Sequence, residues 1–141
     1  MDRRVPCVIM RGGTSKSIFF AAADLPAEQN ARDKVILDAF GSPDRRQIDG
    51  LGGADPLTSK LAIVAPSERD DADIDYTFGQ VGIFAPTVNY SVNCGNTAAA
   101  VGVYAIQAGI VMPSKERHWC AFSVPIVIST SWPRCRPNAD P

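Results

Sequence analysis

The sequence predicts an α+β fold with mainly antiparallel strands. Short apolar runs bounded by glycine, proline or aspartate outnumber the segments with helical character. The strands come in runs and do not alternate strictly with helices, which argues against a parallel βαβ fold. With 141 residues, the chain is long enough to form one compact domain with a substantial buried core.

The first 43 residues predict a strand hairpin followed by a helix. Two apolar runs, 5–10 and 17–21, flank the glycine turn at Gly12-Gly13 and predict paired strands. Asp24-Leu25-Pro26 then opens a helix, with Asp24 or a neighbour as the cap and the proline near the first turn. Apolar residues recur at helical spacing as far as Gly41-Ser42-Pro43, which ends the helix.

The remaining elements follow a glycine-dense loop. In order, the sequence predicts this loop at 48–56, a buried strand at 61–64, a polar turn at 70–73, an alternating half-buried strand at 74–84, a short strand at 86–90 and a helix that starts at Cys94. From Pro113 onward the composition changes, since both tryptophans and the single histidine lie there. We therefore divide the chain into a partial domain, 1–112, and an atypical, poorly ordered tail, 113–141.

Composition and charge exclude several classes of function. The net charge of −1 and the pI of about 5.7 provide no basic surface for nucleic acid or for an anionic membrane. No apolar run is long enough to cross a bilayer, and the start of the chain lacks the apolar segment of a signal peptide. The four cysteines form no CxxC pair and there is one histidine, so we expect no metal site and no disulfide. These features predict a reduced, cytoplasmic protein.

Cys94 is the leading candidate for chemistry. It introduces the small-residue run 97–106, which places its thiol on the first turn of a helix, where free N–H groups and the helix dipole favour a thiolate. The same N–H groups can bind a carboxylate. The alternative is a cysteine buried as a small hydrophobic residue. The polar neighbours Asn93 and Asn96, and the small Gly95, favour the catalytic interpretation.

Lys60 is the second candidate. It lies between the glycine-dense loop and the buried strand, where partial burial would lower its pKa and make it a usable acid or base. A solvated lysine at the start of a strand fits the spacing equally well.

The segment 11–16 is a third candidate, because its backbone N–H groups can form a nest for an anion. A plain hairpin turn is the alternative. The spacing from glycine to Lys16 does not fit a P-loop, and Gly50-Leu51-Gly52-Gly53 does not fit a dinucleotide-binding fingerprint.

Four segments together resemble the PrpF family, which comprises 2-methylaconitate cis-trans isomerase, 4-oxalomesaconate tautomerase and methylitaconate delta-isomerase. They are Met10-Arg11-Gly12-Gly13-Thr14-Ser15-Lys16, Gln47-Ile48-Asp49-Gly50-Leu51-Gly52-Gly53, Thr58-Ser59-Lys60 and Asn93-Cys94-Gly95-Asn96. The resemblance covers roughly residues 4–112. It implies a diaminopimelate-epimerase-like fold, in which two similar domains enclose the substrate.

The resemblance also implies a function. The expected reaction is proton transfer at an allylic carbon of a small unsaturated di- or tricarboxylate, without a cofactor or a metal, and full-length relatives are expected to form homodimers. The implied catalytic residues are Cys94 and Lys60, and their roles as acid and base stay open. The implied substrate-binding residues are Gly12, Gly13, Thr14, Ser15, Ser59, Asn93, Gly95, Asn96 and Thr97.

Three departures from the family pattern qualify these expectations. Ser17 stands where relatives usually have glycine, and Val92 stands where relatives usually have glycine or proline. Relatives are also more than twice as long, so we expect an incomplete domain. A shifted reading of the codons for 118–122 resembles the strand that the family would place there, which predicts a frameshift near Glu116 to His118. The alternative functions are an amino-acid epimerase on the same fold, an inactive truncated protein and a small carboxylate-binding module.

Overall fold

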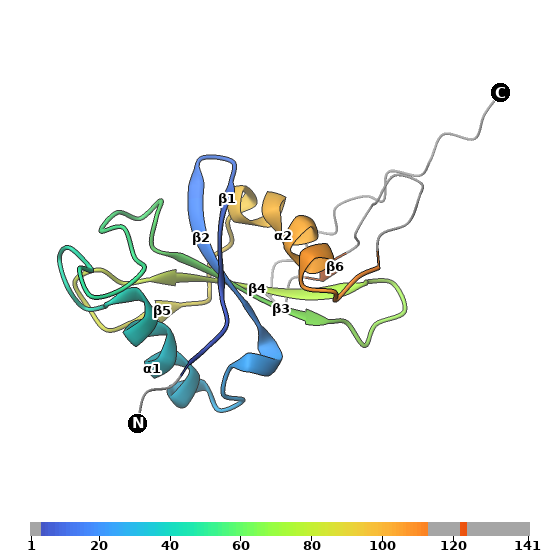
Figure 1. Cartoon of the computed structure of the whole chain (residues 1–141), viewed down its shortest axis with the longest axis horizontal. Helices are drawn as coiled ribbons and strands as arrows, with labels where there is room; N and C mark the ends of the chain where they lie inside the picture. Colours follow the sequence, from blue (N-terminus) through green and yellow to red (C-terminus); the bar gives the residue numbers. More distant parts are fainter. Residues whose placement is uncertain (1–3, 113–121, 124–141) are drawn as a thin grey trace.

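A computed structural model describes residues 4–112 and 122–123 of the chain. Within them, a mixed sheet is flanked by helices (Figure 1). The elements are β1 (Val8–Gly12), β2 (Ser15–Ala21), the 3-10 turn η1 (Ala22–Asp24), α1 (Gln29–Phe40), β3 (Lys60–Pro66), β4 (Ile74–Val81), β5 (Val88–Asn89), α2 (Gly95–Gln107) and β6 (Phe122–Ser123).

The sheet has the order β1-β2-β3-β4-β5, with β6 paired to β4. The pairs β1/β2, β3/β4 and β4/β5 are antiparallel, whereas β2/β3 and β4/β6 are parallel. The predicted mixed, mainly antiparallel α+β fold is therefore confirmed. In the parallel register Ser17 lies beside Lys60, and in the next pair Lys60 lies opposite Gln80.

The two helices pack against opposite faces of the sheet, and the alternation of side chains along the strands decides which face each residue joins. Ile36 and Phe40 of α1 belong to a core cluster with Ile18 and Leu61, among others. The other cluster joins α2 to the opposite face. Its buried members are Phe19, Ala62, Val64, Ile74, Tyr76, Phe78, Ala100, Val101, Tyr104 and Ala105.

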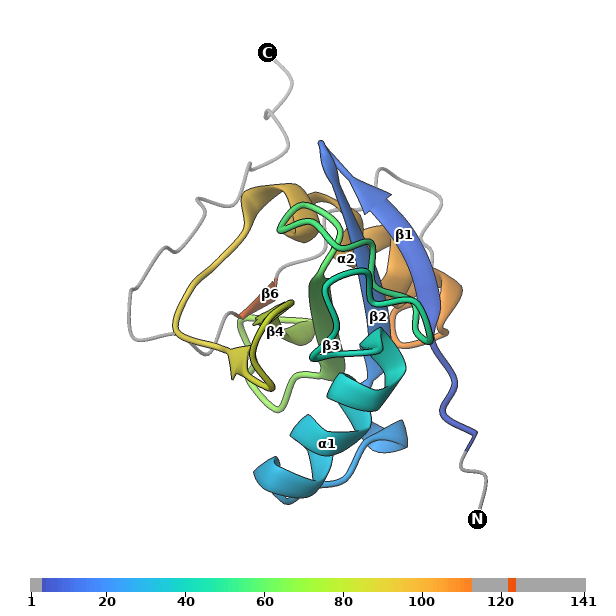
Figure 2. The ribbon, with the colours of Figure 1, turned by 90° about the vertical axis from the view of Figure 1, so that its left-hand side faces the viewer.

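This alternation fixes where the polar residues of the strands lie. Ser15 and Ser17 have the same parity as Phe19 on β2, Lys60 has that of Ala62 on β3, and Gln80 has that of Phe78 on β4. All four side chains are therefore directed to the face that α2 covers. The turn between β1 and β2 lies beside the first turn of α2 (Figures 1 and 2).

The start of α1 differs from the prediction. Asp24 does not cap this helix but closes the short turn η1, and α1 begins five residues later at Gln29. Its cap is Glu28, whose carboxylate accepts hydrogen bonds from the backbone N–H groups of Asn30 and Ala31. Glutamate is not among the strongly preferred N-cap residues, so residue preference favours Asp24 over Glu28 as the cap. The predicted end is confirmed, because Gly41 closes α1 in the left-handed conformation.

Other predicted boundaries also change. The strand expected at 74–84 ends at Val81, and Phe84 beyond it is 79% exposed. The strand expected at 86–90 is reduced to Val88–Asn89. The predictions for the tail, which are poor order and a frameshift, lie outside the described residues. Of this segment the structure describes β6, which pairs with β4.

The cap of α1 predicts a pH-dependent stability. The backbone N–H groups of Asn30 and Ala31 hold the pKa of Glu28 below its ordinary value. Stabilisation by a carboxylate with a lowered folded-state pKa is complete above the unfolded pKa of about 4.3 and is lost as the pH falls through the folded-state value. We expect Glu28→Ala to lower the thermal midpoint at pH 7, and this difference to shrink towards pH 3.

The matched control is Glu68→Ala, which removes an exposed carboxylate that lies outside a helix start. Thermal melts of both variants at the two pH values test the prediction. An equal effect of Glu28→Ala at both pH values would contradict it.

Candidate active site

Cys94 is the N-cap of α2 and has an extended backbone, with φ −138° and ψ 106°. The sequence predicted that Cys94 lies on the first helical turn, but it immediately precedes that turn. Its side chain is half-buried against the α2-side core. Apart from the two adjoining residues and the backbone of α2 itself, no atom of the described residues lies within 4 Å of the position that a side chain on Gly95 would take, so the helix start is open at this position.

Hydroxyl groups surround the sulfur on the sheet side. The Oγ atom of Ser15 lies 4.0 Å from the Cys94 sulfur. Next to this pair, the hydroxyls of Ser17 on β2 and Thr97 on α2 form a hydrogen bond of 2.8 Å. Both residues are fully buried. The polar cluster is thus built jointly by β2 and α2. Only the tertiary fold brings these residues together, since 80 positions separate Ser17 from Thr97.

The hairpin turn fits directly onto the start of α2. A side chain on Gly12 would come within 2.1 Å of the backbone oxygen of Asn96, so only glycine allows this approach. Gly13 has a positive φ of 51° beside the Asn96 side chain, and Nδ2 of Asn96 donates to the Thr14 hydroxyl at 3.0 Å. Both glycines of the predicted binding loop thus serve first to seat the hairpin against the helix.

Lys60 begins β3 and is 8% exposed. Its Nζ atom donates to Oε1 of Gln80 at 2.8 Å and lies 5.2 Å from the centre of the Phe78 ring. The aliphatic part of the side chain is therefore packed, while the ammonium group is held by a neutral amide and an aromatic ring. The interpretation of Lys60 as a freely solvated lysine is wrong.

The surroundings of Cys94 favour its charged form. Burial acts to raise the pKa of the thiol, and the backbone N–H and hydroxyl of Thr97 act to lower it. The positive charge of Lys60 and the hydroxyl of Ser15 lower it further, so that the net pKa lies below the ordinary thiol value. Cys94 packs against the core cluster that contains Phe78, and the Lys60 nitrogen lies over the Phe78 ring, so both residues are on the α2 side of the sheet, as proton transfer between them and one substrate requires.

Two of the predicted binding residues have other contacts. Oδ1 of Asn93 accepts from the backbone N–H of Cys94 at 2.7 Å, which fixes the approach to the helix. Ser59 is fully buried and donates to Oε1 of Gln47 at 2.8 Å. The same oxygen accepts from the N–H of Ala54, so these bonds hold the glycine-dense loop. Ser59 therefore supports the loop that precedes Lys60, and its hydroxyl is already engaged.

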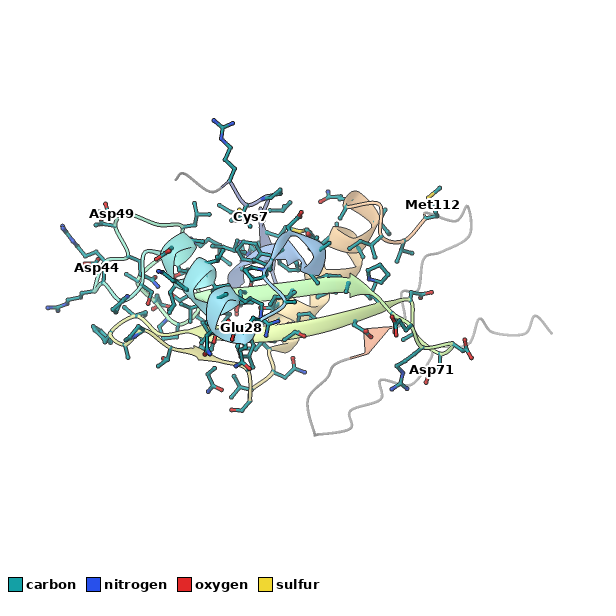
Figure 3. The ribbon with its side chains drawn as sticks, turned by 90° about the horizontal axis from the view of Figure 1, so that it is seen from below. Cys7, Glu28, Asp44, Asp49, Asp71 and Met112 are labelled. Atoms are coloured by element: carbon teal, nitrogen blue, oxygen red, sulfur yellow. The ribbon has the colours of Figure 1, made fainter. Side chains whose placement is uncertain are left out.

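Aspartates of two loops lie at opposite ends of the molecule. Asp44 and Asp49 lie at one end of the molecule and Asp71 lies at the other (Figure 3). Asp71 forms an exposed ion pair with Arg69. Within residues 4–112 and 122–123, no group of three histidine, cysteine, aspartate or glutamate side chains could hold a metal ion. Over the same residues, no helix is long and apolar enough to cross a membrane.

Sequence reasoning missed Gln80 and Ser17. Gln80 lies on a strand predicted from alternation and Ser17 on a strand predicted from an apolar run, and neither pattern indicates which polar residue meets a partner in the fold. The pairing register is the missing information, because it sets both residues beside Lys60.

Thr97→Val tests the hydroxyl cluster. The change leaves the Ser17 hydroxyl buried without its partner, and we expect a loss of about 1–3 kcal/mol in the free energy of unfolding. Loss of the Thr97 hydroxyl should also raise the pH midpoint of Cys94 alkylation. Denaturant unfolding and alkylation followed at the Cys94 peptide by mass spectrometry provide the two measurements.

The double variant Ser17→Ala/Thr97→Val serves as the control, because it removes both hydroxyls and leaves no unpartnered group from this pair. We expect it to be more stable than Thr97→Val. If the double variant were the less stable of the two, the hydroxyl pair would not be the cause.

Comparison with known proteins identifies the family of this chain. A family model described as "PrpF protein" matches residues 2–127. The chain belongs to the PrpF family. The match confirms the predicted resemblance and extends beyond the expected limit at residue 112.

Named PrpF relatives are isomerases and a tautomerase. The chain is 65% identical over 108 residues to 3-methylitaconate isomerase of Eubacterium barkeri, covering 77% of this chain and 28% of the relative. It is 56% identical over 111 residues to 4-oxalomesaconate tautomerase of Pseudomonas putida, covering 79% and 31%. It is 48% identical over 121 residues to 2-methyl-aconitate isomerase of Cupriavidus necator, covering 82% and 31%.

A solved PrpF-type structure confirms the fold. The crystal structure of methylitaconate-delta-isomerase superposes with a TM-score of 0.82 at 57% sequence identity, over 85% of this chain and 31% of the crystallised chain. The chain thus spans about a third of the length of the relatives that it matches.

Proposed function

We propose that this chain carries the cysteine-lysine half of an active site that moves a proton at an allylic carbon of a small unsaturated di- or tricarboxylate. The observation that carries the proposal is the half-buried Cys94 sulfur at the start of α2, with a lowered pKa and with the Lys60 ammonium group on the facing strand. A cysteine with a lowered pKa on the same face as a lysine is typical of an acid-base site. The family relationship supports the same conclusion.

The proposed reaction needs one base and one acid. Cys94 as thiolate removes a proton from the allylic carbon, so that the C–H electron pair enters a delocalised, enolate-like anion. The ammonium group of Lys60 then gives a proton to the other end of that anion, and the double bond shifts. The lowered pKa of Cys94 beside a positive Lys60 supports this order over the reverse. Proton transfer of this kind requires no cofactor.

The start of α2 is suited to the negative charge of the substrate. Backbone N–H groups at Gly95 and Asn96 belong to the first helical turn, where they have no partner within the helix and can bind a carboxylate and stabilise charge that develops in the anion, while the N–H of Thr97 is directed to the Cys94 sulfur. The open space beside Gly95 supports access from this side. The exposed residues Gly13 and Thr14 on the hairpin turn border the same helix start and are proposed to contact the substrate.

The substrate class follows from what the named relatives share. Methylitaconate, oxalomesaconate and methylaconitate are all small unsaturated polycarboxylic acids. Within this class the sequence cues conflict, because the segment 53–60 resembles the oxalomesaconate tautomerases and 78–81 resembles the methylaconitate enzymes. We propose further that the protein acts in the cytoplasm on a free small molecule, without nucleic acid or membrane, and that full-length relatives pair as homodimers.

Isotope exchange tests the proposal. The chain is incubated with each of the three acids in deuterated buffer, and deuterium at the allylic carbon is followed by NMR while binding is measured by calorimetry. We expect binding and exchange with at least one acid. Binding without exchange would instead support a carboxylate-binding module, and the absence of both would contradict any function of this chain on these acids.

A further inference from the structure

Gln80 on β4 has no role in the proton transfer proposed above, yet it makes the hydrogen bond to Lys60. Oε1 of Gln80 accepts from Nζ of Lys60 at 2.8 Å. Nε2 of the same amide donates to the backbone oxygen of Ser59 at 2.9 Å and to that of Pro56 at 3.2 Å. Two carbonyl oxygens can accept only from the NH2 end, so the amide has one orientation and its oxygen faces the ammonium group.

The hydrogen-bond partner of Lys60 is a neutral amide, so the positive charge of Lys60 is not compensated there. Within the described residues the ion pair is Arg69–Asp71, and no carboxylate lies within 4 Å of the Lys60 nitrogen. A buried lysine is usually paired with a charge. A carboxylate at position 80 would make such a pair, but it would also cancel the positive charge that acts on Cys94. The amide fixes the lysine and leaves its charge in place.

We propose that Gln80 is a positioning residue that holds the Lys60 ammonium group toward Cys94 while leaving its charge uncompensated. The loop carbonyls of Pro56 and Ser59 orient Gln80, Gln80 orients Lys60, and Phe78 supports the lysine from its ring face. The electrostatic claim concerns this chain alone. The consequence for catalysis rests on the proposed function.

Among the described residues, the groups that interact with Cys94 are mostly neutral, so a shift in its titration can be traced to Lys60. On the sheet, Ser15 and Ser17 of β2 are neutral hydroxyls, and Lys60 is the charged group of β3 that interacts with Cys94. On β4, Tyr76 interacts electrostatically with Cys94, and burial followed by the charge of Cys94 raises its pKa, so that it stays neutral near pH 7. On α2, Thr97 provides an N–H and a hydroxyl.

The experiment measures Cys94 alkylation by iodoacetamide as a function of pH, read at the Cys94 peptide by mass spectrometry. The variants are Gln80→Met, which removes the hydrogen bonds, and Gln80→Glu, which adds a charge at similar size. Gln29→Met and Gln29→Glu are matched controls at an exposed residue on α1, which packs on the opposite face of the sheet.

We expect both Gln80 variants to raise the pH midpoint by at least about half a unit, with the larger shift for Gln80→Glu, and the Gln29 variants to leave it unchanged. At a pH well below the midpoint, half a unit corresponds to about a threefold slower alkylation, because the thiolate fraction there falls tenfold for each unit. A purely structural Gln80 would lower the melting temperature without moving the midpoint, and this result would overturn the proposal.

A second arm repeats Gln80→Met in a Lys60→Met background. If Gln80 acts through Lys60, the second change should leave the alkylation midpoint where Lys60→Met alone sets it. A further shift in that background would overturn the proposal. The expected shifts of the alkylation midpoint in a protein that exchanges no deuterium would support the positioning role of Gln80 and refute the isomerase function of this chain. The two experiments therefore distinguish failure of the positioning role from failure of the proposed function.

Discussion

Cys94→Ala is expected to slow deuterium exchange at the allylic carbon by about 10²–10⁴-fold, the usual range for removing a positioned acid or base. The thiolate at the start of α2 is the proposed base, and alanine leaves no group there that can accept the proton. Alanine also keeps the backbone and the small volume, so we expect the fold to persist. NMR exchange rates and circular dichroism provide the two measurements.

Lys60→Met should lower the exchange rate over a similar range. The change keeps the length of a side chain that is 8% exposed, but it removes the donor for the returning proton and the charge that favours the thiolate. In the unchanged protein the rate should rise with pH below the ordinary thiol range, because the pKa of Cys94 is lowered. In Lys60→Met this rise should move to higher pH.

Matched controls separate these effects from general damage. Cys7→Ala removes an exposed thiol before β1, and Lys34→Met removes an exposed ammonium group on α1, on the other face of the sheet. Both should retain the full exchange rate. If Cys94→Ala exchanged at the rate of the unchanged protein, the assignment of the base would be wrong.

Gly12→Ala is expected to destabilise the fold by about 1–3 kcal/mol, the usual cost of overpacking. The new methyl group would lie 2.1 Å from the backbone oxygen and 3.0 Å from the carbonyl carbon of Asn96, and backbone atoms cannot rotate away as a flexible side chain can. The hairpin and the start of α2 must then separate. Because that movement withdraws Ser15 from Cys94, the pH midpoint of Cys94 alkylation should rise as well.

Gly95→Ala is the matched control for stability. It changes the glycine that precedes Asn96 in α2, where no atom of the described residues lies within 4 Å of the new side chain apart from the two adjoining residues and the backbone of α2. Alanine is the better helix former, by about 1 kcal/mol in helix interiors, so the unfolding free energy should stay the same or increase. Urea unfolding of both variants tests the pair. Equal losses in both would show that the close approach of hairpin and helix is not what Gly12 serves.

Local patterns in the sequence predicted most of the elements. The apolar runs gave the strands, Gly41 gave the end of α1, and the small residues after Cys94 gave α2. The start of α1 could not be predicted from the local pattern, since Asp24 and Glu28 both offer a carboxylate before the apolar repeat. Which carboxylate caps α1 depends on the path of the backbone after β2, and Asp24 is already part of the turn η1.

The sequence by itself determined the fold class and the family, and it predicted the two candidate reactive side chains, because each depends on residue types at short spacing. It left open whether Lys60 is solvated, which hydroxyls surround Cys94 and what holds the lysine. The tertiary structure decided these points, since sheet register and the packing of α2 bring together residues up to 80 positions apart. The charge on Lys60 acts on Cys94 through space, and a linear pattern carries no information about such distances.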